Sequence, residues 1–465
     1  MTNSKSYGSW LVDKMNYCDL NTDKDIGASA HLVKIGPFLG LIDCGMHPKK
    51  TGLDALPDLS KIGNDTLDFI CITHAHLDHC AALPLLAKQQ PHALILTNHI
   101  GSELMLRMLR NSRAVMQRQR EELGIKEYPL YAYEDIDEVR SRIIPMQNMR
   151  ERTIESKGEY LTISFWGAGH IPGASSVMLE YNKRKILFSG DMSFHSTGIL
   201  KGANPPDTKI DTLIVETTRG SYDRPANSTY ENEIERFVKS VANTIKDGGN
   251  VLIPAFALGR MQEILVIIKD AMKAGHISAQ TPIYASGLGV DIGELMIELS
   301  KKSHHYAFAK QAMEGVKPLK MKIEPAVDFE EKGIYILGSG MLVEKTPSYA
   351  AAAALAEHKS NAIFFVGYCD SETPGGKLLT TQTGDSFDFR DLIYTAKIQC
   401  KIDKFDLSSH ADRSEILDFI LKTEARCVIL THGSENSREW FFDEIIDASP
   451  KTQIIIPELS EEIFV

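Results

Sequence analysis

Residues 73–79 are Thr73-His74-Ala75-His76-Leu77-Asp78-His79, a run that places three imidazoles and one carboxylate close together. Neutral imidazole and carboxylate are donors that zinc accepts, and a catalytic zinc site keeps one position open for water. The apolar residues 67–72 just before the run predict a short buried strand. The donors then lie on the loop at the carboxyl end of a strand, where open α/β sheets carry their active sites. The run therefore predicts a catalytic metal site.

Length and composition indicate a globular protein. The chain has 465 residues, 43% of them hydrophobic, and by length alone we expect two domains. No apolar run approaches the roughly 20 residues that a membrane helix needs. Residues 1–6 lack the basic and then apolar order of a signal peptide, so we expect a cytoplasmic protein without a membrane partner. The seven cysteines are scattered without a CxxC pair, which favours reduced thiols over a disulfide framework.

The formal net charge of -11 argues against a protein that coats nucleic acid without selectivity. Two local basic stretches are candidates for contact with a single strand of nucleic acid. One is residues 301–322, where lysines and histidines face a single acid, Glu314; the other is the near-helical row of Arg107, Arg110 and Arg113. An ordinary solvated face is the alternative for both.

Apolar and helical patterns alternate along the chain, which indicates layered α/β structure with parallel strands and crossover helices. In the first half we expect a helical insertion over residues 97–153 and strands over 31–43, 68–73, 93–97, 160–165, 176–181 and 185–189. A second unit begins after Glu216, with helices over 231–246, 261–274 and 350–358 and strands over 250–254, 333–338 and 362–368. The chain returns to the first domain near Lys401.

Five further polar residues stand at predicted strand ends or in turns that can aim a side chain inward. They are His170 in the glycine-rich residues 167–175, Asp191, Glu216, His410 and His432. Four donors from one loop cannot saturate two metals, whereas a shared carboxylate can bridge them. The five residues are therefore candidates to complete a dinuclear site.

The order of these motifs resembles the metallo-β-lactamase superfamily. Residues 248–260, which end in Gly259-Arg260, and residues 408–412 resemble its β-CASP branch in particular, and the resemblance spans nearly the whole chain. It implies an α/β fold, a metallo-β-lactamase αββα sandwich with an inserted β-CASP α/β domain whose parallel sheet has flanking helices. The implied boundaries are 1–218 and 401–465 for the two parts of the metallo-β-lactamase domain and 219–400 for the β-CASP domain.

The same resemblance implies two zinc ions per chain. One would be bound by His74, His76, His170 and Asp191. The other would be bound by Asp78, His79, Asp191 and His432, with Asp191 as the bridge. Asp78, Glu216 and His410 would be the catalytic residues, with His410 as a general acid that Glu216 orients.

The implied function is zinc-dependent hydrolysis of single-stranded RNA during RNA processing, by internal cleavage that leaves 5′-phosphate and 3′-hydroxyl ends. Glu216, together with residues 42–47, resembles the branch of eukaryotic mRNA 3′-end cleavage factors and the Integrator nuclease. His432, where DNA-repair members carry valine, resembles RNA-acting members. The stop at Val465 resembles a minimal bacterial form.

Several alternatives stay open at the level of sequence. They are a 5′-3′ exonuclease, a nuclease of single-stranded DNA, and a non-catalytic scaffold subunit of a processing complex; a homodimer and partner proteins are also open. Two departures from the family pattern, residues 337–342 and Ser434, fall outside the expected metal ligands and bear on substrate preference.

Overall fold

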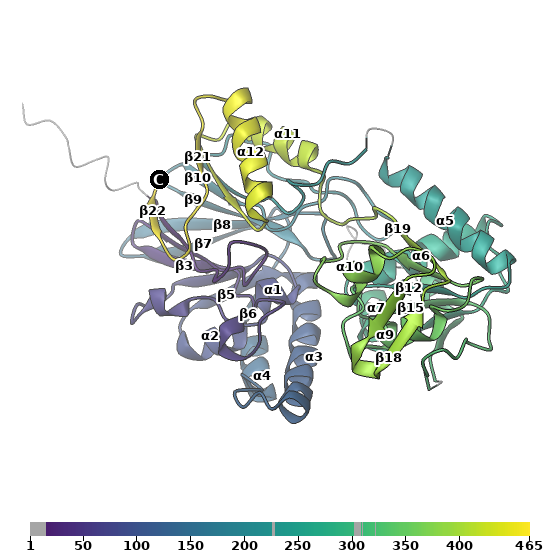
Figure 1. Ribbon diagram of the computed structural model, residues 1–465. Helices are drawn as coiled ribbons and strands as arrows, with labels where there is room; N and C mark the ends of the chain where they lie inside the picture. The colour runs from purple at the N-terminus through teal and green to yellow at the C-terminus, as the bar shows by residue number, and fades with distance from the viewer. Residues whose placement is uncertain (1–14, 226–227, 302–307, 309, 321) are drawn as a thin grey trace, which may run out of the picture. The chain divides into compact units, whose positions relative to one another are not determined.

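The computed structural model describes residues 15–225, 228–301, 308, 310–320 and 322–465, which form two compact units (Figure 1). Unit 1 comprises the described parts of 1–195, 202–223 and 410–465, and unit 2 comprises those of 196–201 and 224–409. The sequence predicts domain boundaries at residues 218 and 400, and these boundaries remain predictions.

Two seven-stranded sheets form unit 1. The first has the order β22 (Glu462–Phe464), β1 (Met15–Asp19), β2 (His31–Ile35), β3 (Phe38–Ile42), β4 (Phe69–Ile72), β5 (Leu94–Asn98) and β6 (Ile143–Met146). The second has the order β21 (Gln453–Ile455), β20 (Cys427–Thr431), β11 (Thr212–Glu216), β10 (Arg184–Phe188), β9 (Ser175–Tyr181), β8 (Glu159–Gly167) and β7 (Glu151–Ser156).

Apolar side chains of both sheets meet in one buried cluster, to which Phe38 and Phe69 contribute from the first sheet and Phe165 and Ile429 from the second. Burial of such side chains is the main favourable contribution to folding. The helices of the first half of the unit are α1 (Leu77–Cys80), α2 (Leu83–Gln89), α3 (His99–Leu123) and α4 (Tyr133–Arg142). Helices α3 and α4 contact the first sheet. On the second sheet, α12 (Glu435–Ala448) packs against β20 and β21 and against α11 (Arg413–Thr423). The expected αββα sandwich is confirmed.

Two local predictions in unit 1 are wrong. Residues 31–43 form a hairpin and not one strand, because the chain turns at Gly36, whose φ of +54° suits glycine. The expected helical insertion over 97–153 is helical only as far as the end of α4. After α4, β6 pairs with β5 in the first sheet, and the start of β7 pairs with β8 in the second sheet. Only Ile154 of the six residues of β7 is buried, so the sequence of this edge strand is mostly polar and lacks the apolar pattern of a strand.

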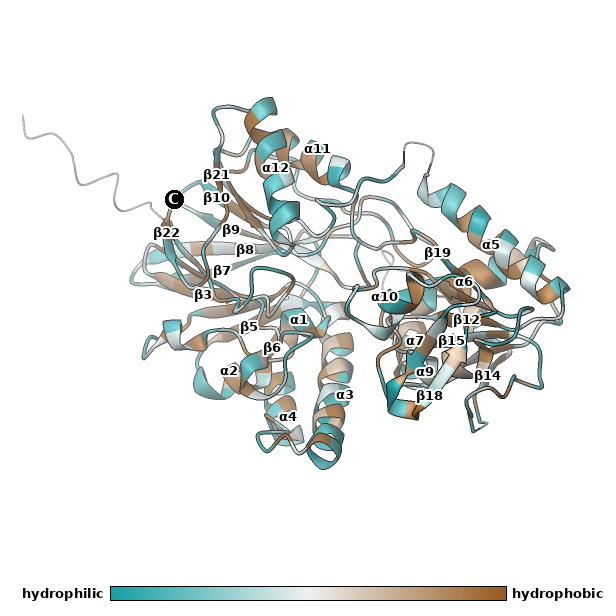
Figure 2. Cartoon of the chain, viewed as in Figure 1, coloured by the Kyte–Doolittle hydropathy of each residue, from teal (hydrophilic) through white to brown (hydrophobic). Residues whose placement is uncertain are grey.

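One six-stranded sheet, parallel throughout, forms the centre of unit 2. Its order is β14 (Val316–Pro318), β13 (Ile283–Ala285), β15 (Ile334–Leu337), β12 (Val251–Pro254), β16 (Ala362–Phe365) and β19 (Lys401–Lys404). Figure 2 shows apolar colour on β12 and β15 and a mixture of hydrophilic and apolar colour along α5 (Tyr230–Lys246).

Successive residues of β12 point to opposite faces of this sheet, as the strand pleat requires. Val251 and Ile253 pack in a cluster with α5 and α6 (Arg260–Lys273), whereas Leu252 packs in a second cluster with α9 (Pro347–Leu355). Helices therefore cover both faces, as crossover connections require. The remaining elements are α7 (Leu288–Ser300), α8 (Lys310–Met313), α10 (Pro374–Leu379) and the hairpin of β17 (Ser386–Phe389) and β18 (Tyr394–Lys397).

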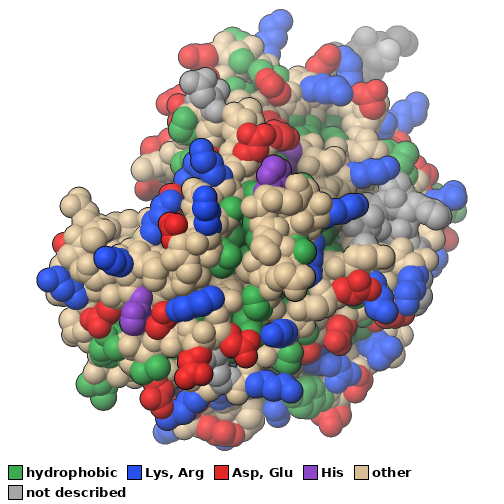
Figure 3. All heavy atoms as spheres, turned by 90° about the vertical axis from the view of Figure 1, so that its right-hand side faces the viewer, with side chains coloured by type: hydrophobic (Ala, Val, Ile, Leu, Met, Phe, Trp, Pro, Cys, Tyr) green, Lys and Arg blue, Asp and Glu red, His purple; other side chains and the backbone are tan. Residues whose placement is uncertain are grey.

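Some described residues of both basic stretches form ion pairs or ring contacts with neighbouring side chains. Three lysines of the first stretch each have an acid within 4 Å: Lys301 pairs with Glu298, Lys317 with Glu331 and Lys322 with Glu324. Residues 302–307, 309 and 321 of this stretch fall outside the described part of the chain. Arg110 pairs with Asp137, and Arg113 lies over the ring of Tyr133. Figure 3 shows acidic and basic side chains intermixed over the face that it displays. Among the described helices, none combines the length and apolar character of a membrane span.

Candidate metal centre

The predicted donors converge because strand ends meet in unit 1. Strands β10, β11 and β20 are parallel neighbours, so Asp191, Glu216 and His432 follow or end strands at the same edge of the second sheet. In the first sheet, β4 leads into the donor run, which continues as the short helix α1. His170 lies between β8 and β9, and His410 precedes α11.

Asp191 is the centre of the first group of donors. One ligand atom from each of His74, His76, His170 and Asp191 lies within 4.8 Å of the others. Asp191 Oδ2 is 3.5 Å from His74 Nε2 and 3.6 Å from His170 Nε2. His170 Nε2 is in turn 3.1 Å from His76 Nδ1, so the nitrogens of these imidazoles point toward one small volume.

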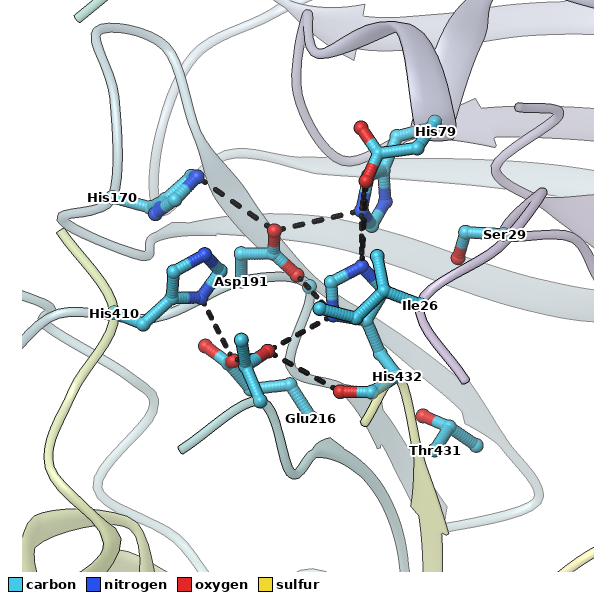
Figure 4. A network of polar contacts seen from close by, with 12 residues as sticks. Ile26, Ser29, His79, His170, Asp191, Glu216, His410, Thr431 and His432 are labelled. Atoms are coloured by element: carbon cyan, nitrogen blue, oxygen red, sulfur yellow. Dashed lines mark hydrogen bonds and ion pairs between the residues drawn. The ribbon is translucent and has the colours of Figure 1, made fainter. Parts of the chain in front are cut away.

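A second group, Asp78, His79 and His432, adjoins the first, and Asp191 also lies within reach of it (Figure 4). His79 Nε2 is 3.2 Å from His432 Nε2 and 3.5 Å from Asp191 Oδ2. His432 Nε2 is 3.6 Å from Asp78 Oδ2, and its Nδ1 is 3.4 Å from Asp191 Oδ1. Asp191 Oδ2 thus faces imidazoles of both groups and Oδ1 faces His432, so this carboxylate is placed to serve both groups.

Two buried polar atoms at the centre of the cluster fit a bound metal. His74 Nε2 and Asp191 Oδ1 are shielded from solvent and make no hydrogen bond with the described residues. Leaving such atoms unpaired is unfavourable, and buried polar groups nearly always find a partner. A cation bound among these nitrogens and oxygens would satisfy both atoms, so the donor set fits a metal.

The pKa values of two donors, Asp191 and His74, shift in the directions that suit metal binding, whereas those of His79 and His432 rise. Burial would lower the pKa of His79 and of His432, but the charges of Asp191 and the other nearby carboxylates together outweigh this effect. Burial would raise the pKa of Asp191, but the charges of His432, His79 and His74 hold it well below its ordinary value. Burial, together with the nearby charge of His79, lowers the pKa of His74 well below its ordinary value. An ionised carboxylate and a neutral imidazole are the protonation states that bind metal.

Glu216 and His410 form a hydrogen-bonded pair beside the first group. His410 Nδ1 lies 2.9 Å from Glu216 Oε2, and its ring centroid is 4.4 Å from that of His170. Glu216 is buried and also accepts hydrogen bonds from the Met192 backbone and the Thr218 hydroxyl. These bonds fix the carboxylate that orients His410.

Three family models match successive parts of the chain. The metallo-beta-lactamase superfamily model matches residues 27–242, the Beta-Casp domain model matches 261–378, and the model of the Zn-dependent metallo-hydrolase RNA specificity domain matches 395–457. The chain belongs to the β-CASP family of the metallo-β-lactamase superfamily. The family prediction from sequence is therefore confirmed.

Named β-CASP relatives match along nearly the whole chain. "Probable RNase MJ4" of Methanocaldococcus jannaschii is 27% identical over 450 residues, which cover 94% of this chain and 97% of the relative. "RNase aCSPSF2" of Saccharolobus solfataricus is 26% identical over 464 residues, covering 97% of this chain and 86% of the relative. The "Integrator complex subunit 11 homolog" of Dictyostelium discoideum is 28% identical, covering 92% of this chain and 58% of the relative.

A solved structure supports the fold alone. The crystal structure of a protein of unknown function from Enterococcus faecalis V583 has a TM-score of 0.57 and 12% identity, covering 97% of this chain and all of that chain.

Sequence reasoning gave no role to Asp43, whose carboxylate contacts the predicted donor His79. Asp43 Oδ2 lies 2.8 Å from His79 Nδ1, and the carboxylate also accepts hydrogen bonds from the backbone and hydroxyl of Thr73. A carboxylate behind a metal-binding imidazole fixes its tautomer and orientation. The available signal was an aspartate directly after the apolar residues 38–42, the same strand-end pattern that identified Asp191 and Glu216.

The structure brings all nine predicted site residues of this β-CASP chain together in unit 1. Their roles as metal ligands and catalytic residues remain predictions.

Proposed function

We propose that this β-CASP protein is a zinc-dependent endoribonuclease that cleaves single-stranded RNA and leaves 5′-phosphate and 3′-hydroxyl ends. The observation that carries the proposal is the complete donor cluster beside the Glu216–His410 pair. The names of the relatives as ribonucleases and the match to an RNA specificity model support RNA as the substrate.

The proposed ligands are those of the two groups. His74, His76, His170 and Asp191 would hold one zinc ion, while Asp78, His79, Asp191 and His432 would hold the other. When bound, the two ions supply Lewis acidity to the phosphate oxygens and to a nucleophilic water.

The chain itself supplies the proton for the departing 3′ oxygen. Because Nδ1 of His410 is directed at Glu216, the proton transfer falls to Nε2 of His410. The Glu216 carboxylate fixes the orientation of the His410 ring. A proton delivered to the 3′ oxygen accounts for the proposed 3′-hydroxyl product.

The proposal is tested by incubating the purified protein and zinc with matched 5′-labelled single-stranded RNA and DNA. Denaturing gels should show internal RNA fragments that an Asp191→Ala control does not produce. Immediate release of labelled mononucleotide would instead mean a 5′ exonuclease, and equal cutting of DNA would remove the restriction to RNA. Zinc binding without cleavage of either strand would overturn the proposal in favour of a scaffold subunit.

A further inference from the structure

The loops after β12, β15 and β16 in unit 2 stand where parallel sheets bind ligands. From β12 the chain passes through α6 to β13 on one side of that strand, and from β15 it passes through α9 to β16 on the other side. Helices α6 and α9 pack in clusters that contain alternate residues of β12. Such a reversal of direction leaves room between neighbouring connections at the carboxyl ends of the strands.

Two contacts join these three loops. A Cβ added at Gly340 would lie 2.9 Å from the Phe256 ring, so the ring of the first loop lies against the backbone of the second. A Cβ added at Gly367 would lie 3.9 Å from Arg260 Nε, so the guanidinium at the start of α6 lies beside the third loop. We call Phe256, Arg260, Gly340, Gly367 and Tyr368 the strand-end surface.

Two aromatic rings of the strand-end surface are open to solvent. Phe256 is 37% exposed and Tyr368 is 50% exposed. Phe256 lies two residues beyond β12 and Tyr368 three residues beyond the neighbouring strand β16. Single exposed apolar residues are ordinary, but two rings at adjacent strand ends form a specific arrangement.

The backbone around the rings is held in place. Gln262 accepts a hydrogen bond from the Gly259 backbone and donates to the Ala257 carbonyl, which fixes the loop that carries Phe256. The Tyr368 hydroxyl donates to Asp370 Oδ2 at 3.2 Å, which orients that ring. A ring already held in its binding position loses little conformational entropy when a ligand stacks on it.

We infer that the strand-end surface binds nucleobases of single-stranded RNA, with Phe256 and Tyr368 as stacking platforms. This inference rests on the proposed function, and it adds the residues of unit 2 that recognise the strand. Stacking on aromatic side chains tolerates every base because each base offers a π face. The surface therefore recognises an unpaired strand and not a particular sequence.

Charge contributes less than stacking at this surface. Arg260 is 6% exposed, and its Nη1 donates to Glu263 Oε2 at 2.8 Å, so the guanidinium is shielded from solvent and already hydrogen-bonded. Glu263 also accepts the hydroxyl of Tyr230. Contacts between free cations and phosphates weaken steeply as the salt concentration rises. Stacking on the two rings involves no such contact, so its contribution to the affinity should be insensitive to salt.

The test measures binding of a fluorescent single-stranded RNA by full-length protein in the His410→Ala background, which keeps every metal donor. Phe256→Ala and Tyr368→Ala should each weaken binding by about 5-fold or more, from the usual ~1–3 kcal/mol of one stacked base. The loss should be equal at low and high salt, whereas Phe256→Tyr and Tyr368→Phe should retain binding. Ile393→Ala and Tyr160→Ala, which remove exposed side chains elsewhere, are the matched controls.

An RNA of the same length with abasic central positions separates stacking from structural damage. The parent protein should bind it more weakly than ordinary RNA, and the two alanine variants should have lost most of that preference. Normal RNA affinity in both alanine variants would overturn the inference while leaving the proposed function intact. An equal loss for ordinary and abasic RNA would also overturn it, since the variants would then act without the bases. If the parent protein neither binds nor cleaves RNA, the proposed function fails and the inference fails with it.

Discussion

In the proposed mechanism, proton transfer depends on His410. Its ring lies beside the metal donors, and its Nδ1 is held by Glu216. His410→Ala should slow single-turnover RNA cleavage by about 10²-fold, the usual contribution of a general acid. Zinc content, measured by atomic absorption, should be unchanged. A variant that loses zinc would show instead that His410 is a ligand.

Asp43 acts through His79. Asp43→Asn keeps the size of the side chain but removes the negative charge facing His79 Nδ1. Loss of such a supporting carboxylate usually costs about 10- to 100-fold in metal affinity, which competition with a chromophoric chelator would measure. Asp68→Asn is the control, because within the described part of the chain its side chain accepts from the Leu39 backbone amide, at the opposite end of β4 from the donor run. Equal affinities in the two variants would remove Asp43 from the site.

The loop after β3 supports the turn that carries the metal donors. Cys44 and Met46 donate backbone hydrogen bonds to the carbonyls of His79 and Leu77. A Cβ added at Gly45 would lie 1.7 Å from the Asp78 carbonyl oxygen, so Gly45→Ala must displace the turn. We expect Gly45→Ala to lower both the melting temperature and the zinc content of the protein. Gly293→Ala, in helix α7 of unit 2, is the control and should leave the zinc content unchanged, because the three atoms nearest to its added Cβ belong to the flexible Met313 side chain. Zinc retention in Gly45→Ala would show that the turn can shift freely.

Elements and donors differ in how well the sequence predicts them. The donor run was predictable because its polar residues are dense and follow an apolar strand. The edge strand β7 was not, because five of its six residues are at least partly exposed and resemble a polar loop. The supporting role of Asp43 depends on partners 30 and 36 positions away, at Thr73 and His79, and no local pattern indicates such pairings.

At the scale of the whole molecule, the predicted metal site lies entirely within one of the two units. Every predicted metal donor belongs to unit 1, although His432 lies far from the donor run in sequence. The sequence predicts the second unit between them from the alternation of helix and strand patterns after Glu216. It also predicts a return to the first domain near Lys401, whereas β19 still pairs in the parallel sheet of unit 2 and the compact unit 1 resumes at His410.

This division predicts an asymmetric response to metal removal. A metal that binds only the native cluster stabilises unit 1 by mass action, by about 4 kcal/mol at a thousandfold excess over its dissociation constant. Chelation should therefore lower the temperature of one calorimetric transition, and adding zinc back should restore it. Limited proteolysis near that transition should cut first within residues 15–195 or 410–465. The Asp191→Ala variant should unfold early with or without chelator, because it has lost the shared carboxylate. A chelator effect of equal size in both proteins would place the stabilising metal outside this cluster.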